Sequence, residues 1–461
     1  MGQKECTRSG KIPIRSVLST KKRRAAAATA AVLLILVSAF IVYKVAFDPY
    51  RHQPRQLRNT EPLDTPLTSE QIGEDMDYVY KRVSERHPAW LDGSDELVAA
   101  FDESYREQCE YLASIDGATV RDEWLATARI LASLGDAHTY CNVRPADEPV
   151  LELVRTDELS DNAVLVNIGG RSIDPILESY REHCSYENDV WLMSCFENDI
   201  VRKPWLDAFG IDTSGEIVFE YSDDRAIKQA VYKFVSVEEY VKNHPQNDSE
   251  EKTTPDTEYF IDTEHNVGVL TLHSCVYDKE YEQIVNQFFT EVKENEIGSV
   301  AVDLRDNGGG NSQVANEFIS YLDTDRFTAF GGTAIRAGSL LINEKSEKFT
   351  VVPKSNTFSG DVYVLTSDAT FSSALDFAVM IQDNGLGTVI GSQPGGMPSS
   401  YGDVVCFRTP NAGVLMQVSF KHFSRVDSTK NDLPLIPDIE CDPDDAPAKL
   451  YELTAAEQNA A

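Results

Sequence analysis

The chain has 461 residues, 42% of them hydrophobic, which is enough for two or three globular domains with cores of their own. Its net charge of −33 is strongly acidic and unevenly placed. Residues 1–24 carry eight Lys or Arg against the single Glu5, so subtracting their +7 from −33 leaves −40 on the rest. A bulk this acidic, with no basic stripe, argues against nucleic acid as a partner.

The first expected element is a membrane-spanning helix over residues 25–46. The basic block ending in KKRR is followed by AAAATAAVLLILVSAFIVY, nineteen residues without a charge. That length suits a hydrocarbon core, and the basic flank places the N-terminus in the cytoplasm. A cleaved signal peptide is the alternative, but bulky residues follow the apolar run where a small-residue cleavage site is needed. We therefore expect a single-pass protein of the cell membrane, with a cytoplasmic tail over 1–24.

Three regions are expected between this anchor and the last domain. Residues 47–66 are rich in proline and polar residues, which is typical of a linker. Residues 67–149 contain three segments with apolar residues at helical spacing and acidic first turns, which predicts a helical subdomain. Residues 150–258 combine strand-like runs such as AVLVNIGG and EIVFEYS with polar segments, so we expect a mixed α+β region.

Residues 259–450 alternate between strands and helices. Apolar runs such as SVAVDL and VYVLTS suit buried strands, whereas KEYEQIVNQFFTEVKEN and SALDFAVMIQDN suit helices packed against them. This alternation is typical of a mostly parallel sheet covered by helices, so the expected fold class is α/β.

The cysteines and histidines show no metal-binding spacing, and we expect neither a metal nor a cofactor. Seven of the eight cysteines follow the apolar run. An exported location permits disulfides, for which Cys184 and Cys195 are the favoured pair. Free buried thiols are an equally supported alternative.

Two strand–turn–helix junctions in the last domain offer places for chemistry. AVDLRDNGGGNS, residues 301–312, puts three glycines ahead of a helix, where backbone amides can approach a ligand closely. It lacks the lysine of a phosphate-binding loop. The second junction, TSDATFSSALDF, puts Ser372 and Ser373 at the start of a helix. Capping is the ordinary role of such a serine, whereas a nucleophile there needs a base to accept its proton.

Together these motifs resemble the tail-specific, or C-terminal-processing, serine proteases. The resemblance covers roughly residues 260–440 and rests on VAVDLRDNGGG and VLTSDATFSSALDFAVMIQDNGLGTVIG, with a short match at LGDAHTYC. It implies a ClpP/crotonase-like core and a serine endopeptidase acting on peptide or protein substrates.

The resemblance also assigns site residues. The family's nucleophile lies eleven residues before the aspartate that matches Asp383 here, which selects Ser372. The amide of Ser373 would form the oxyanion hole together with the amide of Gly309 or Gly310.

The sequence departs from the commoner members of that family at the base. Their lysine would fall on Met397, which cannot accept a proton. The tricorn-like branch uses a histidine, and LGDAHTYC resembles its motif, which makes His138 the expected base. Asp432 is the favoured residue to orient the imidazole, with Asn431 as its alternative. The remaining histidines, His87 among them, show no partner pattern and are expected to be structural or surface residues.

The expected function is that of a membrane-anchored, extracytoplasmic serine peptidase with a Ser–His site, closer to the tricorn-like branch than to the Ser–Lys branch. The alternative is a catalytically inactive ligand- or peptide-binding protein on the same fold, because such a history would also remove the lysine. His138 separates the two, since an inactive protein requires no histidine at that position.

Overall fold

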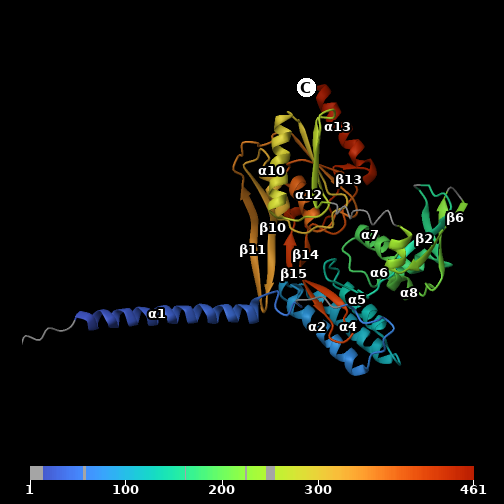
Figure 1. The fold of residues 1–461 in the computed structure, drawn as a ribbon, viewed down its shortest axis with the longest axis horizontal. Coiled ribbons are helices and arrows are strands. Elements are labelled where there is room, and N and C mark those ends of the chain that lie inside the picture. The colour runs from blue at the N-terminus through green and yellow to red at the C-terminus, as the bar shows by residue number, and fades with distance from the viewer. Residues whose placement is uncertain (1–13, 55–58, 161, 224–225, 245–254, 461) are drawn as a thin grey trace, which may run out of the picture.

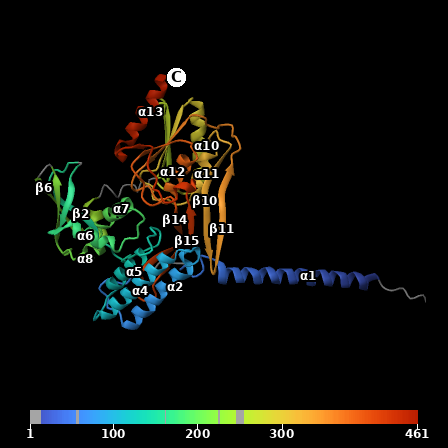
Figure 2. The ribbon, with the colours of Figure 1, turned by 180° about the vertical axis from the view of Figure 1, so that it is seen from behind.

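The computed structural model confirms a mixed α/β fold, built around three β-sheets. In Figures 1 and 2 one long helix projects from the body, and a lobe that contains strands lies on the opposite side of the body. The structure describes all residues except 1–13, 55–58, 161, 224–225, 245–254 and 461.

The projecting helix α1 spans Ile14–Val42 and continues as a π-helical turn over Tyr43–Phe47. The part Ala25–Phe47 is long and apolar enough to cross a membrane, and its most apolar stretch is not buried against the protein. A signal sequence near an N-terminus has the same properties. The helix begins inside the expected basic tail, of which residues 1–13 lie outside the described residues.

The described part of the expected linker lies against the body. The backbone N–H of Thr60 donates to the carbonyl of Arg144, and that of Glu61 donates to the carbonyl of Ala412, both at 3.0 Å. The chain is therefore fixed to the body shortly before the first helix of the body; residues 55–58 of this segment lie outside the described part.

The N-terminal helices pack onto strands from the C-terminal part of the chain. Capping boxes at Thr68 and Thr119 start α2 and α5, which lie in the region where the sequence predicted helices. The buried Trp124 and Leu131 of α5 belong to one apolar cluster with Phe407 and other residues of β14 and β15. The bounds are α2 Ser69–Arg86, α3 Ala89–Asp92, α4 Asp95–Ser114, α5 Val120–Ala132, β14 Ser400–Arg408 and β15 Leu415–Ser424.

The sheet that carries the two junctions has six strands in the order β16-β13-β12-β9-β8-β7, and only β7 runs antiparallel to its neighbour. Helices α10, α11 and α12 form one apolar cluster with this sheet, and α13 covers its other face (Figure 1). The bounds are β7 Thr257–Asp262, β8 Val267–Leu272, α10 Lys279–Glu294, β9 Ser299–Asp303, α11 Gln313–Ile319, β12 Asp361–Thr366, α12 Ser373–Asp383, β13 Thr388–Gly391, β16 Ile439–Glu440 and α13 Ala446–Ala460.

A second sheet joins the N-terminal helical region to this domain. Its order is β1-β15-β10-β11, with β14 also pairing with β15. The strand β1 aligns Tyr140 with Gln417 of β15, which fixes the LGDAH segment two residues upstream. The long β10–β11 hairpin was not predicted, because most β11 side chains are exposed and polar and give no apolar alternation. The bounds are β1 Tyr140–Asn142, β10 Arg326–Ala337 and β11 Leu340–Thr350.

The third sheet is antiparallel, in the order β2-β6-β5-β3-β4, and forms the separate lobe in Figure 1. Cys184 and Cys195, the favoured pair for a disulfide, lie in this region, and both are free thiols. The bounds are β2 Val150–Thr156, β3 Val164–Ile168, β4 Arg171–Ser172, α6 Ile173–Arg181, α7 Asp189–Asp199, α8 Lys203–Ala208, β5 Glu216–Asp223, β6 Ala226–Val235 and α9 Val237–Asn243.

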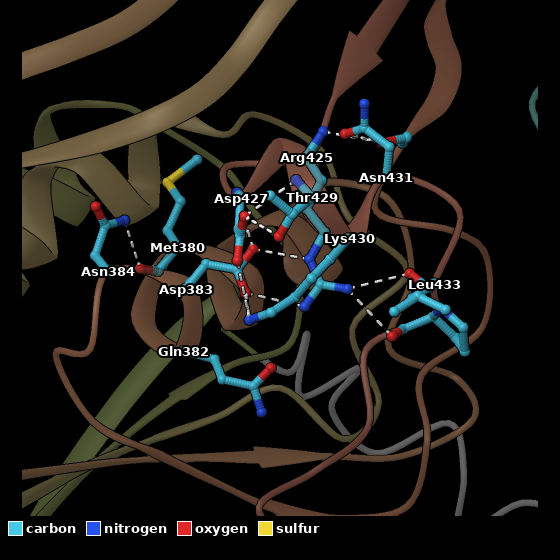
Figure 3. A network of polar contacts seen from close by, with 12 residues as sticks. Met380, Gln382, Asp383, Asn384, Arg425, Asp427, Thr429, Lys430, Asn431 and Leu433 are labelled. Carbon is cyan, nitrogen blue, oxygen red and sulfur yellow. Dashed lines mark hydrogen bonds and ion pairs between the residues drawn. The ribbon is translucent and has the colours of Figure 1, made fainter.

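A buried ion pair fixes the loop that follows β15 (Figure 3). Asp383, the last residue of α12, accepts two hydrogen bonds from Arg425, at 2.7 and 3.0 Å, and one from Lys430 at 3.1 Å. Arg425 also donates to the carbonyl groups of Leu433 and Pro434. Asp383 therefore has a structural role, holding the loop that contains the expected orienting residues.

Replacing Arg425 with methionine is expected to lower the free energy of unfolding by about 3 kcal/mol, because it leaves the carboxylate of Asp383 buried without its main partner. Chemical denaturation of the full-length protein measures this loss. The double variant Arg425→Met/Asp383→Leu is expected to recover most of it. A double variant less stable than the single one would show that the pair does not act as a unit.

Candidate active site

Ser372 lies at the sharp turn between β12 and α12. Its backbone has φ 54° and ψ −126°, a conformation that costs a non-glycine residue about 1–3 kcal/mol. The side chain makes no capping hydrogen bond to the helix. Its Oγ lies 2.9 Å from Nε2 of His138 instead. A strained serine after a parallel strand, with its hydroxyl turned to a histidine, has the geometry of a nucleophile elbow.

Hydrogen bonds hold the backbone of His138 in place. The backbone N–H of His138 donates to Oδ1 of Asp136 at 2.9 Å, and the carbonyl of His138 accepts from Nε2 of Gln417 at 3.0 Å. The ring stacks on Phe371, with 4.6 Å between centroids. Burial lowers the pKa of His138, although the charges of Asp136 and Asp403 act in the opposite direction. The imidazole is therefore neutral at neutral pH and can accept a proton.

The third-sheet lobe also reaches the site, through α7. Trp191 of this helix stacks face to face on Phe371, with 3.8 Å between centroids and an interplanar angle of 8°. Phe371 lies between this indole and the imidazole of His138. The side chains around Ser372 thus come from all three sheet-forming parts of the chain.

Two backbone N–H groups near Ser372 are candidate donors to an oxyanion. The N–H groups of Ser373 and Gly310 donate no hydrogen bond to any residue that the structure describes. By contrast, the N–H of Gly309 donates to Oδ1 of Asn307 at 2.8 Å, so it is occupied. Ser373 Oγ donates to the carbonyl of Gly310 at 3.0 Å and ties the two junctions together. Of the two expected glycine donors, the geometry favours Gly310.

Gly309 allows its turn to lie close to Ser372 and Ser373. It has φ 103°, and a Cβ there would lie 2.7 Å from Cβ of Ser372 and 3.0 Å from N of Ser373. Replacing Gly309 with alanine is expected to displace the serine and lower kcat by roughly 10²-fold. Gly308→Ala is the control, because a Cβ at Gly308 meets nothing within 4 Å. Steady-state kinetics of the two variants compares them, and equal activities would contradict the assigned close approach.

Ser372 and His138 line a cavity of about 460 Å³ whose charged lining is mostly acidic. Lys421, the one lysine among the described lining residues, pairs with Asp403 at 2.5 Å. Burial raises the pKa of Asp376 to about 7 and that of Glu187 to about 8. Five acidic residues are among the described residues that line the cavity, namely Glu187, Glu344, Glu347, Asp376 and Asp403.

The expected orienting residues do not contact His138. Asp432 is exposed, and Oδ1 of Asn431 accepts a hydrogen bond from Ser399. Nδ1 of His138 is buried without a hydrogen bond among the described residues. The carboxylate paired with it is that of Asp136, with Oδ1 at 4.0 Å. Sequence spacing could have suggested this aspartate, which lies only two residues before the histidine.

Met397, at the position of the family's lysine, also lines the cavity, and its N–H donates to Oε2 of Glu187 at 2.7 Å. The side-chain ligand atoms of Asp136, His138 and Glu187 lie within 4.8 Å of one another, close enough to share a metal ion. Both carboxylates already accept hydrogen bonds from the protein.

Comparisons with known proteins agree with this fold. Residues 266–441, which include Gly309, Gly310 and Ser372, match the model of peptidase family S41, which supports that family for this part of the chain. The structure is similar to mature CPAF, with a TM-score of 0.58 at 11% identity over 84% of this chain and 95% of that one.

Two other CPAF structures are similar to this chain, both at 11% identity. For CPAF complexed with lactacystin the TM-score is 0.57, covering 84% of this chain and 98% of that one. For a CPAF mutant the TM-score is 0.60, covering 83% and 95%. At this identity the likeness shows the fold. No curated protein sequence matches the chain.

Proposed function

We propose that the chain is a serine peptidase that hydrolyses peptide bonds with Ser372 as nucleophile and His138 as general base. The match to peptidase family S41 supports the class of enzyme. The 2.9 Å contact between Nε2 of His138 and Oγ of Ser372 carries the proposal, because it places a base within reach of the hydroxyl proton.

In the proposed reaction, His138 removes the proton of Ser372 as Oγ attacks the peptide carbonyl carbon. The carbonyl oxygen becomes an oxyanion, which the N–H groups of Ser373 and Gly310 stabilise. The imidazolium then protonates the leaving amine, and an acyl-enzyme remains on Ser372. Water, deprotonated by the same imidazole, hydrolyses the acyl-enzyme and restores the serine.

The location is part of the proposal. We place α1 across a membrane, with the basic N-terminal tail in the cytoplasm and the cavity on the other side. The apolar stretch Ala25–Phe47 and the basic block before it support this orientation. Protease protection in sealed vesicles tests it, because the body must be digested only from the extracytoplasmic side. A cleaved N-terminus in the mature protein would favour a signal peptide.

The cavity charges suggest which peptides bind best. At pH 8 Asp376, with a pKa of about 7, is mostly ionised, and Lys421 is already paired. Peptides carrying Lys or Arg beside the scissile bond are therefore expected to show kcat/KM at least about tenfold above the same peptides with Glu. Added salt is expected to narrow the difference. Equal cleavage of the two peptide series would contradict an electrostatic preference.

A fluorophosphonate probe, which reacts with activated serines, tests the proposed function. Labelling of the full-length protein at Ser372 is the expected result. The alternative, an inactive binding protein on the same fold, predicts no labelling. The lysine replaced by Met397 favours that alternative, but the hydroxyl–imidazole contact supports an active site.

A further inference from the structure

A second histidine, His87, contacts Asp136 through the carboxylate oxygen that does not accept the hydrogen bond from His138. The side chains of both His87 and Asp136 are 0% exposed, and Nε2 of His87 lies 3.1 Å from Oδ2 of Asp136. His87 directly follows α2, and Asp136 lies in the turn after α5. Two helices of the N-terminal region thus bring the pair together.

The contacts of His87 determine which nitrogen carries its proton. The backbone N–H of Ala89 donates to Nδ1 of His87 at 3.3 Å, so Nδ1 is an acceptor. The proton then resides on Nε2, which donates to Oδ2 of Asp136. The carbonyl of His87 accepts from Nη1 of Arg336 at 2.8 Å, which anchors the backbone. Nε2 of His87 is therefore a fixed donor to the carboxylate.

The second carboxylate oxygen of Asp136, Oδ1, interacts with His138. Oδ1 accepts the backbone N–H of His138 at 2.9 Å and lies 4.0 Å from Nδ1 of its ring. Burial alone would raise the pKa of Asp136. The hydrogen bond from His87, the electrostatic interactions with His87 and His138, and a hydrogen bond from Thr139 outweigh it and bring the pKa down to about 2. The carboxylate therefore remains charged wherever an imidazole base can act.

We infer that His87 is a positioning residue of the catalytic site: it holds Asp136 in place so that this charge faces His138. The inference rests on the proposed function. When His138 takes the proton of Ser372, the resulting imidazolium gains a buried negative charge 4.0 Å from Nδ1. The order Ser372–His138–Asp136–His87 then replaces a triad that would end at Asp432.

Other titratable groups surround this pair and could influence a pH profile. They come from the end of α3, from β14 and β15, and from the segment before α7, and they are Asp92, Tyr401, Asp403, His422 and Glu187. The ring of Tyr401 lies 4.3 Å from that of His87, and its hydroxyl donates to Asp92. None of these groups has a hydrogen bond to Asp136 among the described contacts, and Oδ2 of the carboxylate is contacted by Nε2 of His87.

Two amide substitutions separate positioning from a merely structural role. In His87→Gln the side-chain amide can occupy the place of Nε2 and donate to Asp136, whereas in His87→Asn the shorter amide cannot reach it. We expect His87→Asn to lower kcat by roughly 10²-fold with KM little changed, and His87→Gln to recover most of that loss.

The pH dependence gives a second readout. Without its donor, Asp136 binds a proton more readily, so the acid limb of kcat/KM in His87→Asn is expected to move to higher pH. Asp136→Asn is expected to move the limb the other way, because it removes the negative charge that raises the pKa of His138. Equal kcat and superimposable pH profiles for the two His87 variants would overturn the inference.

Two further measurements keep the result interpretable. Fluorophosphonate labelling of the wild type at Ser372 tests the proposed function separately: no labelling refutes that function, whereas equal labelling rates in wild type and His87→Asn refute only the role of His87. Nitrogen NMR of the wild type needs no substitution. It is expected to show His87 protonated at Nε2 only, and a proton on Nδ1 would contradict the inference.

Discussion

Replacing Ser372 with alanine is expected to abolish peptide hydrolysis, lowering kcat on the order of 10⁶-fold, as loss of a serine nucleophile does in a protease of another fold. The variant keeps the oxyanion donors and the cavity but has no oxygen to attack the carbonyl. The side chain of Ser372 makes no capping hydrogen bond to the helix, so the substitution is expected to change the stability of the fold little. Single-turnover and steady-state assays of the full-length protein measure the loss.

Ser373→Ala is the matched control. Its hydroxyl donates to the carbonyl of Gly310, but its proposed role depends on the backbone N–H, which alanine retains. Loss of that one hydrogen bond is worth about 1 kcal/mol, so the expected decrease in activity is about tenfold at most. A larger loss in Ser373→Ala than in Ser372→Ala would reverse the assignment of the two serines.

Replacing His138 with glutamine is expected to lower kcat by a factor approaching that of Ser372→Ala, because the two residues act as one unit. The pH profile identifies the base. Since burial lowers the pKa of His138, the imidazole stays neutral further into the acid range, and the acid limb of kcat/KM is expected below about pH 6.5. In His138→Gln the residual activity is expected to lack this limb.

His265→Gln is the control for a histidine outside the site, in the turn between β7 and β8, where its ring pairs with Asp262. It is expected to retain wild-type kinetics and the same acid limb. If His138→Gln kept the limb, another group of the cavity, such as Asp376 or Glu187, would be the titrating base.

Local motifs predicted the residues at the two junctions well. Apolar strands followed by glycines or serines and then by helical spacing fixed the order of β9, β12 and α12, because such patterns depend on neighbouring residues. The family spacing selected Ser372 and the LGDAHTYC motif selected His138; the two residues are 234 positions apart in the chain, and Oγ and Nε2 lie 2.9 Å apart in the structure. Their catalytic roles remain a proposal.

The partners of these residues were harder to predict, because they depend on tertiary contacts. His87 showed no pattern in sequence, since its partner Asp136 lies 49 residues away and meets it only when α2 and α5 pack. The expected role of Asp432 assumed that its loop turns toward His138. The buried pair Asp383–Arg425 fixes the start of that loop, and Asp432 faces solvent.

The β10–β11 hairpin illustrates a different difficulty. Strand β11 pairs along its length with β10 but exposes most of its side chains, so the stabilising interactions are backbone hydrogen bonds that leave no apolar pattern. Glu344 and Glu347 of this strand nevertheless line the cavity beside Ser372. Part of the candidate binding site was therefore invisible to an analysis based on apolar spacing.

The most direct test of the account is fluorophosphonate labelling of the full-length protein, with the labelled residue identified by mass spectrometry. The account predicts a label on Ser372 in the wild type and in Ser373→Ala, and none in Ser372→Ala or His138→Gln. A label on another residue, or labelling that persists in Ser372→Ala, would contradict it.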